Sequence, residues 1–256
     1  MQGFETWQWV LLFAASLLVG ISKTGIPGLG ILFVALFANV FEDGRQATGL
    51  VLPLLIAGDL FAVAFYRRHM EWRWLVRLFP WAAAGVVAGF LAMGRMNDRQ
   101  SGMLIGGIIL AFSAAHFLRE RRGRAAPVAG DSPPPGGGMP PWFCPVIGLL
   151  MGFTTLVANA AGPLATLFFL AAGLPKMEFV GTGAVFFMVL NWFKVPFMAG
   201  LGLITVESLG LNAMLVPAVF TGAIAGRLLL RHVNQRLFEN IALALGVLAG
   251  LRLLLG

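Results

Sequence analysis

The sequence Gly20-Ile-Ser-Lys-Thr-Gly-Ile-Pro-Gly-Leu-Gly30 interrupts an otherwise apolar stretch that covers residues 9–40. A second apolar stretch, residues 143–172, is interrupted in the same way by Gly152-Phe-Thr-Thr-Leu-Val-Ala-Asn-Ala-Ala-Gly-Pro163. Such breaks expose backbone N–H and C=O groups, which lipid tolerates only where protein buries them or where they line a cavity. Interrupted segments at corresponding points of two halves are typical of the binding site of a membrane transporter.

The composition places the chain in a lipid bilayer. Hydrophobic residues make up 59% of the 256 residues, charged residues make up 11%, and the mean hydropathy is +0.86. A soluble domain carries charges on about a quarter of its residues. Eight apolar units are long enough to cross a hydrocarbon core about 30 Å thick: residues 7–40 (broken), 47–66, 74–93, 100–118, 142–173 (broken), 180–199, 208–230 and 237–255. The sequence therefore predicts an all-α polytopic membrane protein.

The eight units fall into two halves of similar length. Residues 119–141 contain six prolines and five glycines, which indicates a loose linker rather than a helix. We therefore expect a first transmembrane repeat in residues 1–118 and a second in residues 142–256, each with one broken unit and three further helices. Residues that recur in order, 137 positions later, support this division: Pro80, Gly85, Gly89, Asn97 and Arg99 correspond to Pro217, Gly222, Gly226, Asn234 and Arg236.

Charge placement indicates how each broken unit is arranged. If each unit crosses once, the sixteen Lys and Arg residues other than Lys23 and Lys194 divide nine to seven across the membrane, which gives no orientation. If each unit is a helical hairpin that returns to its own side, they divide twelve to four, as the positive-inside rule requires. Each half then makes an odd number of crossings, so the second repeat is inverted. This arrangement places the linker in the cytoplasm and both termini outside.

Three ionisable residues lie well inside apolar units, namely Lys23, Asp59 and Lys194. A charge at mid-membrane costs roughly 3 kcal/mol, so such residues are candidates for function. Lys23 lies in the first break between Ser22 and Thr24, where a helix that began nearby would add backbone N–H donors and a positive dipole end. Lys23 can contact an anion, pair with Asp59 to support the fold, or extend its ammonium group to a membrane surface.

Asp59 and Lys194 occupy nearly equivalent positions in the two halves. Asp59 follows Thr48 by 11 residues, and Lys194 follows Thr182 by 12 residues. Opposite charges at such positions can meet at the midplane. Asp59 is then either a proton carrier that couples transport to protons or a static counter-ion of a lysine, and both roles remain open.

The second break supplies neutral hydrogen-bonding groups where the first supplies a charge. Together the breaks predict a pocket that suits a small oxyanion. Its substrate-binding residues are Ser22, Lys23, Thr24, Gly25, Thr154, Thr155 and Asn159, with Asp59 and Lys194 as coupling or counter-ion residues. The sequence contains no metal-ligand spacing, nucleotide-binding loop or Ser–His–Asp set, so we expect no cofactor, no metal, no catalytic residues and no enzyme activity. The net charge of +7 does not indicate a nucleic-acid partner, because the arginines lie in short loops between spans.

These residues resemble a known family. The first break, the run Ala47-Thr-Gly-Leu-Val-Leu-Pro53 that leads to Gly58 and Asp59, and the duplicated halves are similar to the TauE/SafE family of sulfite and organosulfonate permeases. The resemblance covers essentially the whole chain. It implies export or uptake of small sulfur-containing anions across the bacterial cytoplasmic (inner) membrane. The sequence does not distinguish between sulfite, sulfoacetate, thiosulfate or another carboxylate as the substrate.

The sequence thus predicts a secondary transporter whose small anionic substrate is held at the midplane between two broken helical segments. The alternative is a gated anion channel without ion coupling, which would need a continuous pore. An intramembrane enzyme is disfavoured because no nucleophile–base pair is present.

Overall fold

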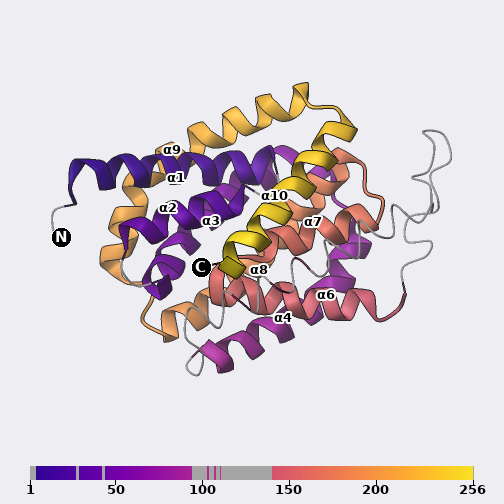
Figure 1. Ribbon diagram of the computed structural model, residues 1–256, viewed down its shortest axis with the longest axis horizontal. Helices are drawn as coiled ribbons and strands as arrows, with labels where there is room; N and C mark the ends of the chain where they lie inside the picture. The colour runs from indigo at the N-terminus through magenta and orange to yellow at the C-terminus, as the bar shows by residue number, and fades with distance from the viewer. Residues whose placement is uncertain are drawn as a thin grey trace.

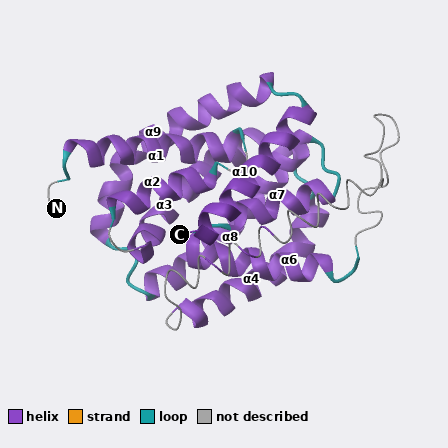
Figure 2. Ribbon diagram, viewed as in Figure 1, coloured by secondary structure: helices purple, strands orange, loops and turns teal. Residues whose placement is uncertain are grey.

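The computed structural model of the chain describes residues 4–26, 29–41, 44–93, 103, 107, 110 and 140–255. Every regular element within these ranges is a helix, and none of the described residues forms a β-strand (Figure 2). The all-α class predicted from the sequence is therefore confirmed. The predicted fourth apolar unit, residues 100–118, and the predicted linker, residues 119–141, lie outside the described residues apart from positions 103, 107, 110, 140 and 141.

The helices follow the predicted apolar units closely. The first half contains α1 (Thr6–Thr24), α2 (Gly30–Val40), α3 (Gly44–Tyr66), the short 3₁₀ helix η1 (Arg67–His69) and α4 (Trp72–Met93). The second half contains α6 (Phe143–Ala158), α7 (Ala161–Ala171), α8 (Lys176–Gly200), α9 (Val206–His232) and α10 (Gln235–Leu255). Among the described residues, five helices are long and apolar enough to cross a membrane: Thr6–Thr24, Ala47–His69, Trp72–Met93, Lys176–Gly200 and Val206–His232. The chain is a multi-pass membrane protein.

Both breaks are present, but they are shorter than the glycine-rich runs suggest. α1 continues through Gly20 and ends at Thr24, and α6 continues through Gly152 and ends at Ala158. The short connections let α2 pack against α1, and α7 against α6, as in helical hairpins (Figure 1). Glycine costs about 1 kcal/mol in a helix interior, and tertiary packing around these two glycines offsets that cost.

The broken helix of each half packs along a helix of the other half, α1 along α9 and α6 along α4 (Figure 1). A Cβ atom on Gly20 would overlap the Val219 carbonyl of α9, and a Cβ atom on Gly152 would overlap the Ala82 carbonyl of α4. Val219 follows Ala82 by 137 residues, the spacing of the sequence repeat. These matching close contacts support an internal repeat, while its inversion across the membrane stays a prediction.

α3 and α8 pack against each other and join the two halves. Buried apolar residues of α1, α2 and α3 form one cluster with residues of α9, and those of α4, α6, α7 and α8 form most of a second cluster. The contact between α3 and α8 carries three deeply buried polar residues, Asp59 from α3 and Asn191 and Lys194 from α8. The fold thus brings both breaks and these polar residues into one region.

Candidate functional site

Lys23 lies in the last turn of α1, where it faces the negative end of the helix dipole. Gly25 caps this helix end, and its backbone N–H donates to the carbonyl of Ile21. The sequence left open a helix that begins near Lys23, but at Lys23 a helix ends, and the next one begins only at Gly30. A cation is favoured near the C-terminal carbonyl groups of a helix, so the local structure stabilises the Lys23 ammonium rather than an anion.

Lys23 forms an ion pair with Asp59. The Lys23 Nζ atom lies 2.7 Å from Asp59 Oδ1, and the Asp59 side chain is fully buried whereas that of Lys23 is 12% exposed. The same ammonium lies 4.6 Å from the ring centre of Phe187 on α8, a cation–π distance. One of the roles that the sequence left open, pairing with Asp59, is therefore present, while the Lys23 side chain keeps a small exposed surface.

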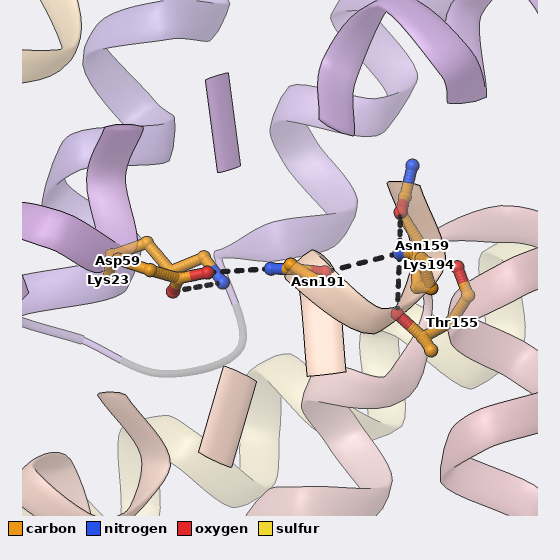
Figure 3. A network of polar contacts seen from close by, with 6 residues as sticks. All are labelled: Lys23, Asp59, Thr155, Asn159, Asn191 and Lys194. Atoms are coloured by element: carbon orange, nitrogen blue, oxygen red, sulfur yellow. Dashed lines mark hydrogen bonds and ion pairs between the residues drawn. The ribbon is translucent and has the colours of Figure 1, made fainter. Parts of the chain in front are cut away.

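Asn191 connects the two buried charges. Its Nδ2 atom donates to Asp59 Oδ2 at 2.6 Å, and its Oδ1 atom accepts from Lys194 Nζ at 3.2 Å (Figure 3). Asn191 precedes Lys194 by three residues, so both side chains leave the same face of α8. Asn191 was not among the residues predicted from the sequence. The available signal was an amide side chain one helical turn before a lysine within an apolar span.

Lys194 is held by the second break. Its Nζ atom donates to the Thr155 carbonyl oxygen and the Thr155 hydroxyl oxygen at 3.0 Å each, and to Asn159 Oδ1 at 2.7 Å (Figure 3). In the part of the chain that the structure describes, every oxygen bonded to this ammonium is neutral. Lysine has three N–H donors, so the hydrogen bonds are satisfied while the positive charge is not compensated by a direct contact.

The second break is shaped by Asn159, which has φ 50° and ψ 29° in the left-handed region. Asparagine adopts this conformation more readily than most residues, so it ends α6 at low cost. Its Nδ2 atom donates to the Thr48 carbonyl of α3 at 3.1 Å while its Oδ1 atom holds Lys194. One side chain therefore links the second break to helices of both halves.

A cavity of about 100 Å³ lies between the two breaks. The first half contributes Ser22, Lys23, Gly25 and Asp59 to its lining, and the second half contributes Thr155, Asn159, Thr166 and Asn191. The rest of the wall is mostly apolar and includes the rings of Phe33, Phe169, Phe179 and Phe187. Five of the seven predicted substrate-binding residues thus share one cavity, together with Asp59, while Lys194 lies directly behind Thr155 and Asn159.

The structure does not bring Thr24 and Thr154 into this cavity. The Thr24 hydroxyl is buried and donates to the carbonyl groups of Ala223, at 2.7 Å, and Gly20, at 3.0 Å. The Thr154 hydroxyl is buried and donates to the Met151 carbonyl at 3.3 Å. Both hydroxyls satisfy backbone groups within the packed helices. The sequence could not separate these residues from their cavity-lining neighbours, because adjacent positions on a helix point in different directions.

Thr166 on α7 is a cavity residue that the sequence analysis missed. Thr166 lines the cavity, and its buried hydroxyl has no hydrogen-bond partner among the described residues. The start of α7 also borders this region, since Ala160, Gly162 and Pro163 line the cavity and no side chain caps the helix. A buried hydroxyl without a partner costs about 1–3 kcal/mol, so Thr166 is a further candidate for contact with a bound group.

The electrostatics of the site favour an anion. The cavity region contains two lysine side chains, Lys23 and Lys194, and one acidic side chain, Asp59. Within the described residues, no group of three or more His, Cys, Asp or Glu side chains is arranged to hold a metal ion. The arrangement can therefore bind a small anion through charge and neutral donors.

The sequence matches the family described as sulfite exporter TauE/SafE over residues 12–253, which is nearly the whole chain. The chain belongs to the TauE/SafE sulfite exporter family. No curated protein and no solved structure gives a significant match. For this TauE/SafE protein, family membership confirms the resemblance found in the sequence and assigns the chain to a class of membrane transporters. It also agrees with a small anionic substrate and with embedding in a bilayer.

Proposed function

We propose that this protein is a secondary transporter that carries a small sulfur-containing anion, such as sulfite or an organosulfonate, across the bacterial inner membrane. The observation that carries the proposal is that two lysines and one aspartate lie at the cavity between the two breaks. A charge inside a membrane is costly and is kept where it serves a substrate path. The family supplies the class of substrate.

Coulomb attraction gives the scale of the effect. At an effective dielectric constant of 20, opposite unit charges 4 Å apart attract by about 4 kcal/mol. This gain exceeds the roughly 3 kcal/mol that a charge costs in the centre of a membrane helix. An anion in contact with Lys23 therefore offsets the cost of one lysine charge, whereas a neutral ligand of similar size does not.

Three kinds of donor support the placement of the anion. Lys23 lines the cavity directly and keeps part of its surface exposed there. The Thr166 hydroxyl and the first N–H groups of α7 offer neutral donors from the opposite half. Lys194 acts from behind Thr155 and Asn159, and its charge adds to the positive potential without direct contact. Thr155, Asn159 and Ser22 complete the polar lining.

The position of the site between two similar halves suits alternating access. Transporters with repeated halves bind substrate at the interface of the repeats, near the midplane, and expose it to each side in turn. In the proposed topology the second repeat is inverted, the linker at residues 119–141 is cytoplasmic, and both termini are outside. Asp59 is the proposed coupling or counter-ion residue, because its carboxylate is the acidic group in direct contact with Lys23.

Counterflow in proteoliposomes tests the proposal. Vesicles that contain purified protein and unlabelled sulfite inside should accumulate labelled sulfite from outside against its gradient, because a carrier exchanges one substrate for another. The same assay with sulfoacetate and thiosulfate ranks the substrates. A flux that only dissipates the gradient, with no counterflow for any of these anions, would indicate a channel and would overturn the carrier mechanism.

A further inference from the structure

A second cavity, of about 210 Å³, lies where the end of α3, the start of α8 and the end of α9 meet, and several of its lining residues are basic. Its charged and polar lining consists of Tyr66, His69, Lys176, Arg227 and Arg231, and its apolar lining includes Phe65 and Leu230. α3 ends at Tyr66, α8 begins at Lys176 and α9 ends at His232. The cavity therefore lies at one end of the membrane-spanning helices, and the hydroxyl of its Tyr66 donates to the Thr24 carbonyl at the end of α1, 2.8 Å away.

Lys176 supports the shape of this cavity. Its Nζ atom donates to the carbonyl oxygens of Leu230 at 3.0 Å and Val233 at 2.5 Å, which lie at the C-terminal end of α9. These bonds use two of the three N–H donors of the ammonium. The side chain thus fixes the end of α9 beside the start of α8 and still contributes a full positive charge.

Arg227 and Arg231 supply the donors of the cavity. They are separated by one helical turn on α9, and the Arg227 guanidinium lies 4.4 Å from the ring centre of Phe65. Neither arginine forms an ion pair with a carboxylate among the described residues, and no acidic side chain lines the cavity. The guanidinium groups are therefore available to an anion that brings its own negative charge.

The other half shows that packing alone does not require an arginine here. By the 137-residue spacing, the position equivalent to Arg227 is Phe90 on α4. The Phe90 ring packs against Phe197 of α8, with 5.4 Å between the ring centres. An aromatic residue fills this position in the first half, whereas a guanidinium over an aromatic ring fills it in the second half.

We propose that this cavity binds the phosphate group of an anionic ligand, supplied either by a phospholipid headgroup or by free phosphate. Planar guanidinium groups pair with phosphate oxygens through two parallel hydrogen bonds. Basic pockets between transmembrane helices at the membrane surface suit anionic headgroups. Ile224 and Leu228 on the outer surface of α9 are 40% and 50% exposed, and they offer an apolar path for an acyl chain beside the cavity.

Thermal unfolding of the purified full-length protein in detergent tests this site. The protein is titrated separately with phosphatidylglycerol in mixed micelles, with phosphatidylcholine, and with inorganic phosphate, and the midpoint of unfolding is recorded. The test variants are Arg227→Gln/Arg231→Gln and the single variant Arg231→Gln, whose exposed side chain can be changed without loss of the fold. The control is Arg68→Gln/Arg236→Gln, which removes two exposed charges that do not line the cavity.

Phosphatidylglycerol should raise the midpoint of the wild type more than phosphatidylcholine does. The Arg227→Gln/Arg231→Gln variant should bind it at least about tenfold more weakly, as expected when charge-assisted hydrogen bonds are lost, while the control keeps its affinity. If only inorganic phosphate raises the unfolding midpoint of the wild type, and this rise is lost in the same variants, the site binds soluble phosphate. The proposal would be overturned if the control variant bound the ligand as weakly as the test variants. It would also be overturned if neither phosphate source gave a rise in the midpoint that Arg231→Gln reduces.

Discussion

Lys23 and Lys194 are both ammonium groups inside an apolar helix bundle, but their surroundings differ in a way that predicts different roles. Lys23 has a carboxylate partner and a partly exposed surface in the cavity. Lys194 is fully buried, and its bonds go to neutral oxygens from the second break. We therefore expect Lys23 to contact the substrate and Lys194 to supply a fixed positive charge.

Lys23→Ala should lower the affinity for sulfite far more than Lys23→Arg, because the site requires a positive charge that reaches the cavity. The measurement is a thermal-shift titration of each purified variant with sulfite. Lys23→Ala also leaves Asp59 buried without its partner, so Lys23→Ala/Asp59→Asn serves as a matched control that restores neutrality. Equal and small losses of affinity in both single variants would contradict direct contact with the anion.

Asp59→Asn should reduce the yield of folded protein, because it leaves the Lys23 ammonium without its carboxylate, and breaking a buried pair typically costs about 3–5 kcal/mol. Lys23→Met in the same chain should restore the yield. If the single variant instead folds normally and its transport loses the pH dependence of the wild type, Asp59 is a proton carrier rather than a static counter-ion. Yield by size-exclusion chromatography and transport at several pH values distinguish these outcomes.

Thr166→Val should weaken anion binding without loss of stability. The Thr166 hydroxyl is buried with no partner among the described residues, so its removal relieves a cost of about 1–3 kcal/mol in the empty protein. Thr154→Val is the control, because the Thr154 hydroxyl bonds to the Met151 carbonyl away from the cavity. Unchanged sulfite affinity in Thr166→Val, measured by thermal-shift titration, would mean that this hydroxyl does not bind the anion.

At the scale of helices, the apolar units predicted the elements well, whereas the breaks were predicted too long. The predicted unit 180–199 lies within α8, and 208–230 lies within α9, because uninterrupted apolar runs leave few other structures in lipid. The glycine-rich runs that begin at Gly20 and Gly152 predicted that the helices are already interrupted at these two residues. They are helical because each allows a neighbouring helix to approach at backbone distance, and a contact between distant segments is not visible in local composition.

Gly152→Ala should destabilise the folded protein by about 1–3 kcal/mol, the usual cost of overpacking, because a Cβ atom there would overlap the Ala82 carbonyl of α4. Gly210→Ala is the matched control, since a Cβ atom at Gly210 of α9 meets nothing within 4 Å. Alanine favours a helix interior over glycine by up to about 1 kcal/mol, so the control should be neutral or more stable. A normal unfolding midpoint for Gly152→Ala would contradict the close packing of α6 on α4.

At the scale of the whole molecule, the sequence predicted that the two breaks meet, but it did not predict which polar side chains line the cavity and which bond to other groups. Lys23, Thr155 and Asn159 share the cavity as expected. Asn191 and Thr166 were missed because a single polar residue in an apolar span gives no sign of which face it occupies. Their roles follow from the contact of α3 with α8 and from the placement of α7, which depend on packing between the two halves.

The positions of the basic residues predict how the protein is oriented in the membrane. The hairpin arrangement predicted that Arg67, Arg68, Lys176, Arg227 and Arg231 share one side, and the cavity lined by Lys176, Arg227 and Arg231 is next to η1. Cytoplasmic loops are enriched in Lys and Arg, so this end and the linker should face the cytoplasm while the N-terminus faces outward.

Cysteine labelling of intact cells measures this orientation, with Cys144→Ala as the background because Cys144 is the single native cysteine. A membrane-impermeant maleimide should label Gly3→Cys and should fail to label Ser132→Cys until the membrane is opened. Both positions lie outside the described residues. Efficient labelling of Ser132→Cys in sealed cells, with protection of Gly3→Cys, would reverse the orientation. Labelling of one terminus and the linker together would contradict the hairpin arrangement itself, because an odd number of crossings in the first half must place them on opposite sides.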